Sequence, residues 1–297
     1  MNDILFVGDM SWDETFRVSH FPLPDEKVLA NGIVDGFGGV AANSAVAAAR
    51  AGADVAFMGR TGTDAISARF DEHMRANGIR TMLSRCEGML CRVVSIIEPH
   101  GEKRLVLYPG VSIYPSPDDL GLLELVGVFH LHTAIYGPAG RLLIDMARKA
   151  GIDWSLDLEP ATFPEGLEQL AYAIDGASTV FVNDRAASLI GKDSVGRLLA
   201  MGAKSVIRTC GSDGAEYHQA GTCLSVSAPE AMPVRDTTGA GDCLAGWFLA
   251  GRARGLSPAA ALEDAVFAAT LSCAGDGAQT AYPTFEDFNA QKDKRAK

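Results

Sequence analysis

The apolar and polar positions divide most of the chain into two alternating kinds of segment. Short apolar runs that end in glycine or a polar residue, as is typical of buried parallel strands, occupy residues 4–9, 55–59, 126–131, 152–156, 179–182 and 205–208. Alanine-rich or amphipathic helical stretches occupy residues 38–52, 65–77, 138–150, 165–173, 184–189 and 194–201. Strands that alternate with helices form right-handed crossover units, so the pattern predicts an α/β fold in which a mostly parallel central sheet lies inside a three-layer α/β/α sandwich.

Two regions depart from this rhythm and read as exposed strands. Residues 14–19 and 28–35 form one expected pair, and residues 90–98 and 103–108 form a second pair around a hairpin-like turn. Two separated β pairs in an α/β chain predict one small additional sheet. We therefore expect a single domain over residues 1–297, with a β lid inserted from about 13–36 and 89–110.

Residues 236–242 read Asp-Thr-Thr-Gly-Ala-Gly-Asp and lead into an apolar helix. The first backbone N–H groups of a helix have no internal partner, and the helix dipole adds partial positive charge there. A turn with few side chains lets an anion approach those amides, so phosphate is the natural guest. Asp242 would repel a bound phosphate, but it suits the removal of a proton from a hydroxyl that attacks the phosphate.

A second glycine turn precedes another helix near the start of the chain. Gly38 and Gly39 lead into an alanine-rich helix with Asn43 in its first turn, and Gly62 and Asp64 follow the next expected strand. Small residues allow close packing of such a helix on the sheet. A polar residue near a helix start is common, so Asn43 alone carries little weight.

Composition and charge exclude several classes of protein. With 47% apolar residues the 297-residue chain can form a sizeable core, and its apolar runs are shorter than a membrane span. A net charge of −11 argues against a nucleic-acid partner. We expect no signal peptide, because residues 1–8 read as a first strand, and a cytoplasmic location with reduced cysteines, because the six cysteines show no C-x-x-C spacing.

The two glycine motifs, about 200 residues apart and in this order, resemble the two signatures of the ribokinase-like (PfkB) carbohydrate kinase family. The resemblance covers nearly the whole chain. It implies a cytoplasmic ATP-dependent sugar kinase with the ribokinase-like fold, in which the lid closes over the sugar and pairs with the lid of a second subunit to form a homodimer. By this resemblance Asp242 is the catalytic base, and Gly239, Ala240 and Gly241 form the anion hole for the transferring phosphoryl group.

The resemblance also assigns binding residues. Asp13, Gly38, Gly39 and Asn43 match the sugar-binding positions, whereas Asn183, Thr209, Gly211 and Gly214 match positions near the phosphates and ribose of ATP. Asp236 and Thr238, with backbone around residues 274–277, resemble the site of K⁺ in potassium-activated members. One departure concerns Mg²⁺: the family often has Asn-x-x-Glu at this place, but here Asp184, Arg185 and Ala186 follow Asn183.

Three readings of the activity remain open. A kinase of a small neutral sugar, ribose- or ketohexose-like, is favoured; a nucleoside kinase and a catalytically silent sugar-binding regulator are the alternatives. A dinucleotide-dependent dehydrogenase is disfavoured, because no G-x-G-x-x-G follows the first strand. We expect substrate discrimination at residues 24–28 and 130–133.

Overall fold

The computed structural model describes residues 3–229 and 232–295, and in this part of the chain two sheets organise the molecule. The larger sheet has nine strands in the order β13-β12-β11-β10-β9-β8-β1-β4-β5. They are β1 (Asp3–Val7), β4 (Val55–Thr61), β5 (Arg80–Arg85), β8 (Val128–Thr133), β9 (Asp153–Leu158), β10 (Thr179–Asn183), β11 (Ser205–Thr209), β12 (Ala215–Gln219) and β13 (Thr222–Val226). Neighbours from β5 through β11 are parallel, and β12 and β13 extend this sheet in an antiparallel hairpin.

The order of the strands reverses at β1. From this central strand the chain first builds outward to β4 and β5, and it then returns to the other side of β1 to add β8 through β11. Ligands of open parallel sheets bind beyond the carboxyl ends of the strands at such a reversal. The topology therefore places a crevice next to the ends of β1, β9 and β10.

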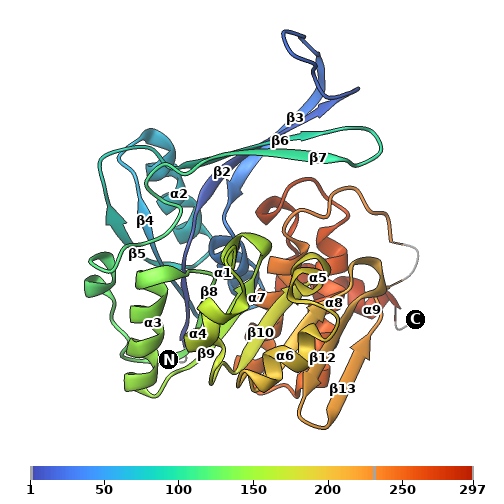
Figure 1. The fold of residues 1–297 in the computed structure, drawn as a ribbon. Coiled ribbons are helices and arrows are strands. Elements are labelled where there is room, and N and C mark those ends of the chain that lie inside the picture. Colours follow the sequence, from blue (N-terminus) through green and yellow to red (C-terminus); the bar gives the residue numbers. More distant parts are fainter. Residues whose placement is uncertain (1–2, 230–231, 296–297) are drawn as a thin grey trace.

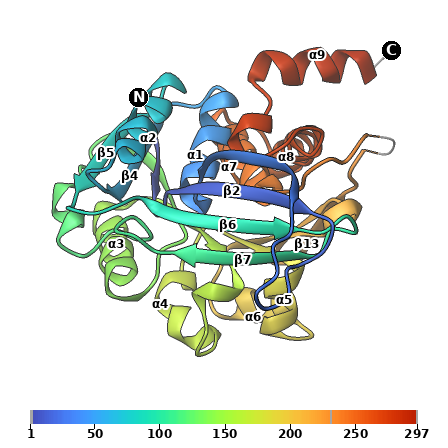
Figure 2. The same ribbon diagram turned by 90° about the horizontal axis from the view of Figure 1, so that it is seen from above.

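Helices cover both faces of the sheet and complete the three layers (Figure 2). One face carries α1 (Val40–Arg50), α2 (Ala65–Ala76), α7 (Ala240–Ala253), α8 (Pro258–Ser272) and α9 (Phe285–Arg295). The other face carries α3 (Gly137–Ala150), α4 (Ala171–Ile174), α5 (Asp184–Ile190) and α6 (Ser194–Ala200). Short 3₁₀ turns are η1 (Asp119–Leu122), η2 (Pro160–Thr162), η3 (Leu167–Leu170), η4 (Gly211–Asp213) and η5 (Gln279–Ala281). Each face buries its own apolar cluster against the sheet.

Helices α1 and α7 pack with unusually close backbones because small residues line both. A Cβ at Gly246 would lie 2.7 Å from the Cβ of Ala47 and 2.8 Å from the backbone nitrogen of Ala48, closer than van der Waals contact allows. The alanine run of α1 is buried along this contact. Because both predicted glycine turns start these helices, the helix contact also fixes the distance between the two turns.

The smaller sheet stands apart from the body and lies above it in Figure 1. Its strands, in the order β3-β2-β6-β7, are β2 (Ser11–Val18), β3 (Ala30–Gly38), β6 (Cys91–Ile97) and β7 (Lys103–Tyr108). The pair β2–β6 is parallel, while β2–β3 and β6–β7 are antiparallel. Two insertions far apart in sequence thus build one lid sheet.

The structure also differs from the sequence-based expectations. Strand β5 and the β12–β13 hairpin were not predicted, and the helix expected at 165–173 is divided into η3 and the short α4. Residues 130–133, expected to select substrate, lie in the central strand β8, where His132 is fully buried. That expectation is wrong because these side chains are buried and bonded inside the sheet: His132 contacts the hydroxyl of Ser155, and the hydroxyl of Thr133 donates to the carbonyl of Val7. Within the described residues, no helix has both the length and the apolar character that crossing a bilayer requires.

Candidate active site

The glycine turn before α7 faces the crevice at the sheet's reversal point. Gly239 adopts a left-handed conformation (φ 74°) as the N-cap, and its carbonyl accepts a 2.9 Å hydrogen bond from the hydroxyl of Tyr282. Among the residues that the structure describes, no side chain caps the helix, so the N–H groups of Gly241 and Asp242 in its first turn have no partner within the helix. A Cβ at Gly241 would meet nothing within 4 Å. The turn therefore presents backbone donors to an open space in which an anion fits.

Asp242 lies in the same first turn and is held by one specific partner. The Nδ2 of Asn43, from α1, donates a 2.7 Å hydrogen bond to its Oδ2. Burial, followed by the nearby charge of Asp157, raises the pKa of Asp242 well above its ordinary value, and Asn43 opposes that shift; Glu159 and Asp9 add to it. Among the described residues, no ion pair neutralises Asp242. A carboxylate so placed is poised to take up a proton.

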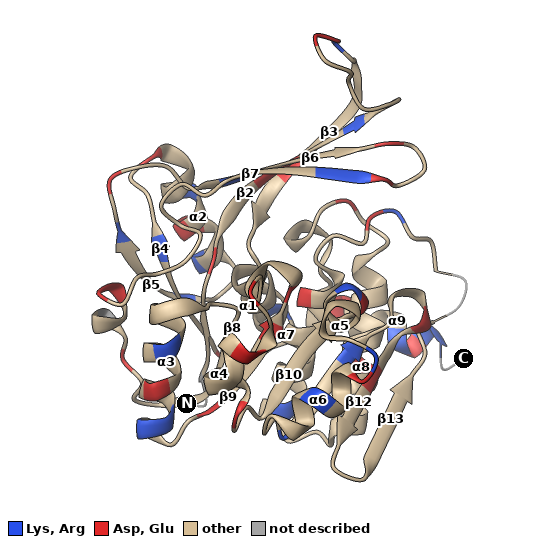
Figure 3. Ribbon diagram, viewed as in Figure 1, with Lys and Arg blue, Asp and Glu red and all other residues tan. Residues whose placement is uncertain are grey.

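A cavity beneath the lid is lined by Asp13 of β2 and reaches Thr238, which directly precedes Gly239. Asp13 accepts a 2.6 Å hydrogen bond from Ser11, and burial raises its pKa to about 6, with Asp9 adding to the shift and Ser11 and Lys103 opposing it. Gly38 lies directly against Asp13, since a Cβ there would be 2.6 Å from the carboxyl carbon. The basic segment at the start of β7 in Figure 3 carries Lys103, which lines this cavity. Other lining residues are Thr15, Asp35, Ser95, Gln279 and Thr280.

Two further cavities meet on the other side of the glycine turn. One is lined by Asp157, Glu159, Asn183, Thr209, Thr237 and residues 239–242. The other is largely apolar, and Gly211, Gly214, Met232, Val234, Leu244 and Val266 are among its lining residues. Thr209, Thr237, Ala240 and Gly241 line both, so the two cavities adjoin. An elongated ligand with an anionic end and a flat apolar end suits this shape.

Asn183, Gly211 and Gly214 thus lie where the sequence predicted them, at the ends of β10 and β11. The Oδ1 of Asn183 caps α5 by accepting a 2.8 Å hydrogen bond from the backbone nitrogen of Ala186. Gly211 and Gly214 both have positive φ, 56° and 99°. A Cβ at Gly214 would lie 2.7 Å from the backbone nitrogen of Ala228, so only glycine allows the chain to pass there.

Asp236 organises the loop that precedes the glycine turn. Its Oδ1 accepts from the backbone nitrogen and the hydroxyl of Thr238 at 2.9 and 2.7 Å, and its Oδ2 accepts from the backbone nitrogen of Gly277 at 3.0 Å. Burial raises its pKa, but the hydrogen bonds from Thr238 and Gly277 outweigh burial and hold it below the ordinary value. Asp236 is therefore an ionised carboxylate that joins residues 236–238 to the loop at Gly277.

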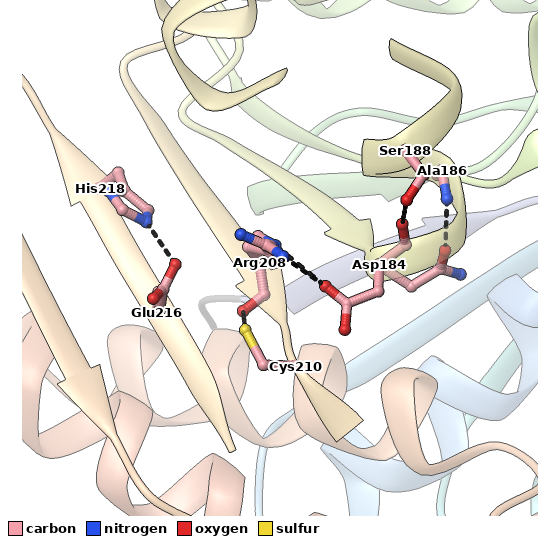
Figure 4. Close-up of polar contacts among 8 residues, drawn as sticks. Asp184, Ala186, Ser188, Arg208, Cys210, Glu216 and His218 are labelled. Carbon is pink, nitrogen blue, oxygen red and sulfur yellow. Dashed lines mark hydrogen bonds and ion pairs between the residues drawn. The ribbon is translucent and has the colours of Figure 1, made fainter. Parts of the chain in front are cut away.

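Asp184, which follows Asn183, is engaged elsewhere. Its Oδ1 accepts from the Nε and Nη2 of Arg208 at 3.0 and 2.8 Å, and both side chains are exposed (Figure 4). The neighbouring ion pair between Glu216 and His218 lies on β12. Asp184 is not among the residues that line the cavity beside Asp242. Asp157 and Glu159 line that cavity instead.

Sequence reasoning did not identify four polar residues of the site. Asp9 accepts from the backbone nitrogens of Val40 and Ala41 at 3.0 Å each and so caps α1. Asp9, Asp157 and Glu159 follow or end the strands β1 and β9, and the rule that ligands bind at the carboxyl ends of strands could have found them. The fourth, Gln279, donates a 2.9 Å hydrogen bond to the Oδ1 of Asn43 from 236 residues away, and no local pattern marks it.

Comparison with known proteins gives consistent matches over the whole chain. The model of a family described as "pfkB family carbohydrate kinase" matches residues 1–285. Ribokinase of Bacillus subtilis is 28% identical over 290 residues, covering 96% of this chain and 97% of the relative.

Solved structures of similar proteins share the fold. The structure of ribokinase from Cryptococcus neoformans in complex with ADP has a TM-score of 0.82 and 26% identity, covering 98% of this chain and 100% of that one. A nucleoside kinase from Methanocaldococcus jannaschii has a TM-score of 0.84 at 21% identity, covering 99% of each chain, and this likeness concerns the fold alone.

Proposed function

The chain belongs to the pfkB family of carbohydrate kinases, and from this premise we propose that it transfers the γ-phosphoryl group of ATP to a hydroxyl of a small neutral sugar, ribose- or ketohexose-like. It is a phosphotransferase with an alcohol group as acceptor. One observation carries the assignment of the site. The half-buried carboxylate of Asp242 lies in the first turn of α7, beside the free N–H groups of the glycine turn.

The geometry supports a division of labour in the reaction. Asp242 would take the proton of the attacking hydroxyl, and the donors of residues 239–241 would stabilise the charge on the transferring phosphoryl group. Asp13, with the backbone at Gly38 and Gly39, would accept from and donate to the other hydroxyls of the sugar. Asn43 would orient the base. Closing the lid over the acceptor cavity would exclude water, a competing acceptor.

The nucleotide is proposed to bind in the two adjoining cavities, its phosphates beside Asn183, Thr209 and the glycine turn. The apolar cavity, with Gly211 and Gly214 at its edge, would hold the adenine and ribose. The largely apolar lining of this cavity supports the assignment, as does the ADP complex of the ribokinase from Cryptococcus neoformans, which shares the fold.

Two cations fit the residues present. Asp157 and Glu159 line the phosphate cavity, and among the described residues neither takes part in an ion pair. Burial, then the charge of Glu159, raises the pKa of Asp157. Burial, then the charge of Asp9, raises the pKa of Glu159, and Arg185 opposes that shift. Uncompensated carboxylates suit Mg²⁺, which would neutralise phosphate charge when bound. For K⁺ we propose Asp236 and Thr238, because Asp236 is an ionised carboxylate in a loop rich in backbone carbonyls.

The lid supports a further proposal, a homodimer. Lys103 and Leu105 of β7 line the acceptor cavity, so the alternate residues Val106 and Tyr108 lie on the opposite face of the lid. They are 65% and 56% exposed, and Ile33 of β3 is 58% exposed. An apolar sheet face of this kind is typical of an interface. Sedimentation equilibrium of Val106→Glu should then show a monomer, whereas an unchanged mass would exclude this face.

The six free cysteines support a cytoplasmic location.

The test of the function is ADP release with Mg-ATP and K⁺ across free pentoses, hexoses, ketoses, sugar acids, sugar phosphates and nucleosides. We expect one neutral sugar to give strong turnover, and Asp242→Asn to abolish it while the protein stays folded. Turnover with nucleosides alone would replace the sugar by a nucleoside as acceptor. Tight sugar binding without ADP formation would indicate a regulator, and full activity of Asp242→Asn would overturn the role of the base.

A further inference from the structure

A chain of three hydrogen bonds leads from the base into the protein and crosses four elements. Asn43 Nδ2, on α1, donates to Asp242 Oδ2 of α7 at 2.7 Å, and Gln279 Nε2, on η5, donates to Asn43 Oδ1 at 2.9 Å. His73 Nε2, on α2, lies 2.7 Å from Gln279 Oε1. Gln279 and Asn43 are 2% and 6% exposed, so water competes little for these bonds.

The chemistry of the groups fixes the direction of this chain. In the ionised form in which it would act as a base, Asp242 only accepts hydrogen bonds, so Asn43 must turn its Nδ2 toward Asp242 and its Oδ1 toward Gln279. Gln279 must then offer its Nε2 to Asn43 and its Oε1 to His73. It follows that Nε2 of His73 carries a hydrogen. Reversing any one amide would set two acceptors or two donors against each other.

The surroundings of His73 keep it neutral at pH 7. Burial lowers its pKa, and the nearby guanidinium of Arg50 lowers it further, while the bond to Gln279 opposes both. The ring of Phe37 packs against the imidazole with centroids 5.0 Å apart. Arg50 is the charged group that acts on it from the neighbouring α1. A neutral imidazole with hydrogen on Nε2 is the tautomer that the chain requires.

Gln279 belongs to a loop that holds both parts of the reaction centre. Two residues earlier, the backbone nitrogen of Gly277 donates to Asp236, and three residues later the hydroxyl of Tyr282 donates to the carbonyl of Gly239. The loop over residues 277–282 therefore touches the turn that holds the anion hole and, through Asn43, the base. Motion of the loop would displace both together.

We propose that Gln279 and His73 are positioning residues for phosphoryl transfer, which act by forcing the amide of Asn43 to donate to Asp242. This inference rests on the proposed kinase function. Without the two residues Asn43 could turn its carbonyl oxygen toward Asp242, which would push the carboxylate away from the acceptor hydroxyl. A misplacement of about 1 Å at a reacting group can cost on the order of 10²-fold in rate.

An isosteric substitution separates positioning from packing. Gln279→Glu keeps the shape and still accepts from His73, but it cannot donate to Asn43 and so favours the reversed amide. Gln279→Met keeps most of the volume and imposes no direction. We expect kcat to fall by about 100-fold in Gln279→Glu and about 10-fold in Gln279→Met. Gln279 also lines the acceptor cavity, so a direct role in binding the sugar would show as a raised KM. We expect the KM of both substrates to change by less than about three-fold.

His73 supplies the rescue experiment. Gln at this position can place an amide nitrogen near that of Nε2, so His73→Gln should retain kcat within about three-fold, whereas His73→Leu should lose about 10-fold. The proposal is overturned if Gln279→Glu keeps kcat within two-fold of wild type, or if the sugar KM rises as much as kcat falls. Equal activity of His73→Gln and His73→Leu would likewise exclude a donor role.

A readout without turnover keeps this test distinct from that of the proposed function. The ¹⁵N NMR signals of His73, assigned by their loss in His73→Gln, should show hydrogen on Nε2 in the wild-type protein at neutral pH. Hydrogen on Nδ1 would overturn the inference even if the enzyme is a kinase. If wild-type protein turns over no acceptor, the proposed function fails, and the tautomer still decides the direction of the chain.

Discussion

Acid should destabilise this protein through two buried histidines of β8. His130 is 8% and His132 0% exposed, and each has a ring nitrogen 2.8 Å from the hydroxyl of Ser155. The ring of His132 packs edge-on against Phe6 and Phe181. Burial lowers the pKa of His130 to about 4 and that of His132 to about 3. Both are therefore neutral in the folded protein at every pH above 5.

The magnitude follows from the difference between the folded and unfolded chains. An unfolded histidine titrates near pH 6.5, so below that pH the unfolded state binds more protons and gains free energy. The stabilisation is fully present above about pH 7.5 and declines as the pH falls toward the folded values. At pH 5 the pH lies about 1.5 units below the pKa of an unfolded histidine, and each unit is worth about 1.36 kcal/mol. Each histidine therefore lowers the free energy of unfolding by about 2 kcal/mol, and the pair lowers it by about 4 kcal/mol. This figure depends little on the folded pKa values, provided that both lie below 5.

The assay is urea unfolding from pH 8 to pH 5 of the wild type and of His132→Asn, in which the amide can keep a bond to Ser155 without titrating. Buried carboxylates with raised pKa values, such as Asp9 and Glu159, act in the opposite direction, but they are common to both proteins. The variant will be less stable than the wild type at pH 8, because the asparagine side chain is smaller than the histidine it replaces and leaves a cavity. The difference should shrink by about 2 kcal/mol at pH 5, and parallel stability curves would refute the reasoning.

Three further predictions follow from the site and the core. Asp242→Asn should lower kcat by about 10²–10⁴-fold with an unchanged far-ultraviolet circular dichroism spectrum, because it removes the general base. The sugar KM should rise as the pH falls below about 6, where the carboxylate of Asp13 takes up a proton; Asp13→Asn should show a raised KM, by about tenfold, without that pH dependence. Gly246→Ala should destabilise the protein by about 1–3 kcal/mol in urea unfolding, whereas Gly32→Ala, where a Cβ meets nothing within 4 Å, should cost far less.

Local patterns predicted much of the fold because they describe local physics. The alanine run of α1 and the apolar runs of the parallel strands predict their own structure, and the glycine turn before α7 predicts an opening for an anion. Strand β5 was not predicted because it lies at an edge of the sheet and its buried and exposed positions alternate little, with most residues partly exposed. The β12–β13 hairpin was not predicted because its two strands follow each other without a helix between them.

Contacts between distant segments were the part that the sequence could not supply. Gln279 reaches Asn43 across 236 residues, and nothing in the sequence around it indicates a polar chain. Asp184 could be judged only when its ion pair with Arg208 was seen. His130 and His132 were misassigned to the substrate site because their sequence does not reveal that both side chains are buried against Ser155 of β9.

The tight contact of α1 with α7 has a consequence for how such an enzyme can diversify. The glycine turns before α1 and α7 are spaced by backbone atoms in close contact at Gly246, and a side chain at that position would not fit. Changes of acceptor must therefore arise elsewhere, in the lid strands and the cavity they cover. The fold thus separates the fixed spacing of the two glycine turns from the lid strands and their cavity, where substitutions are tolerated. Mutational libraries aimed at new acceptors should be confined to the lid strands and that cavity.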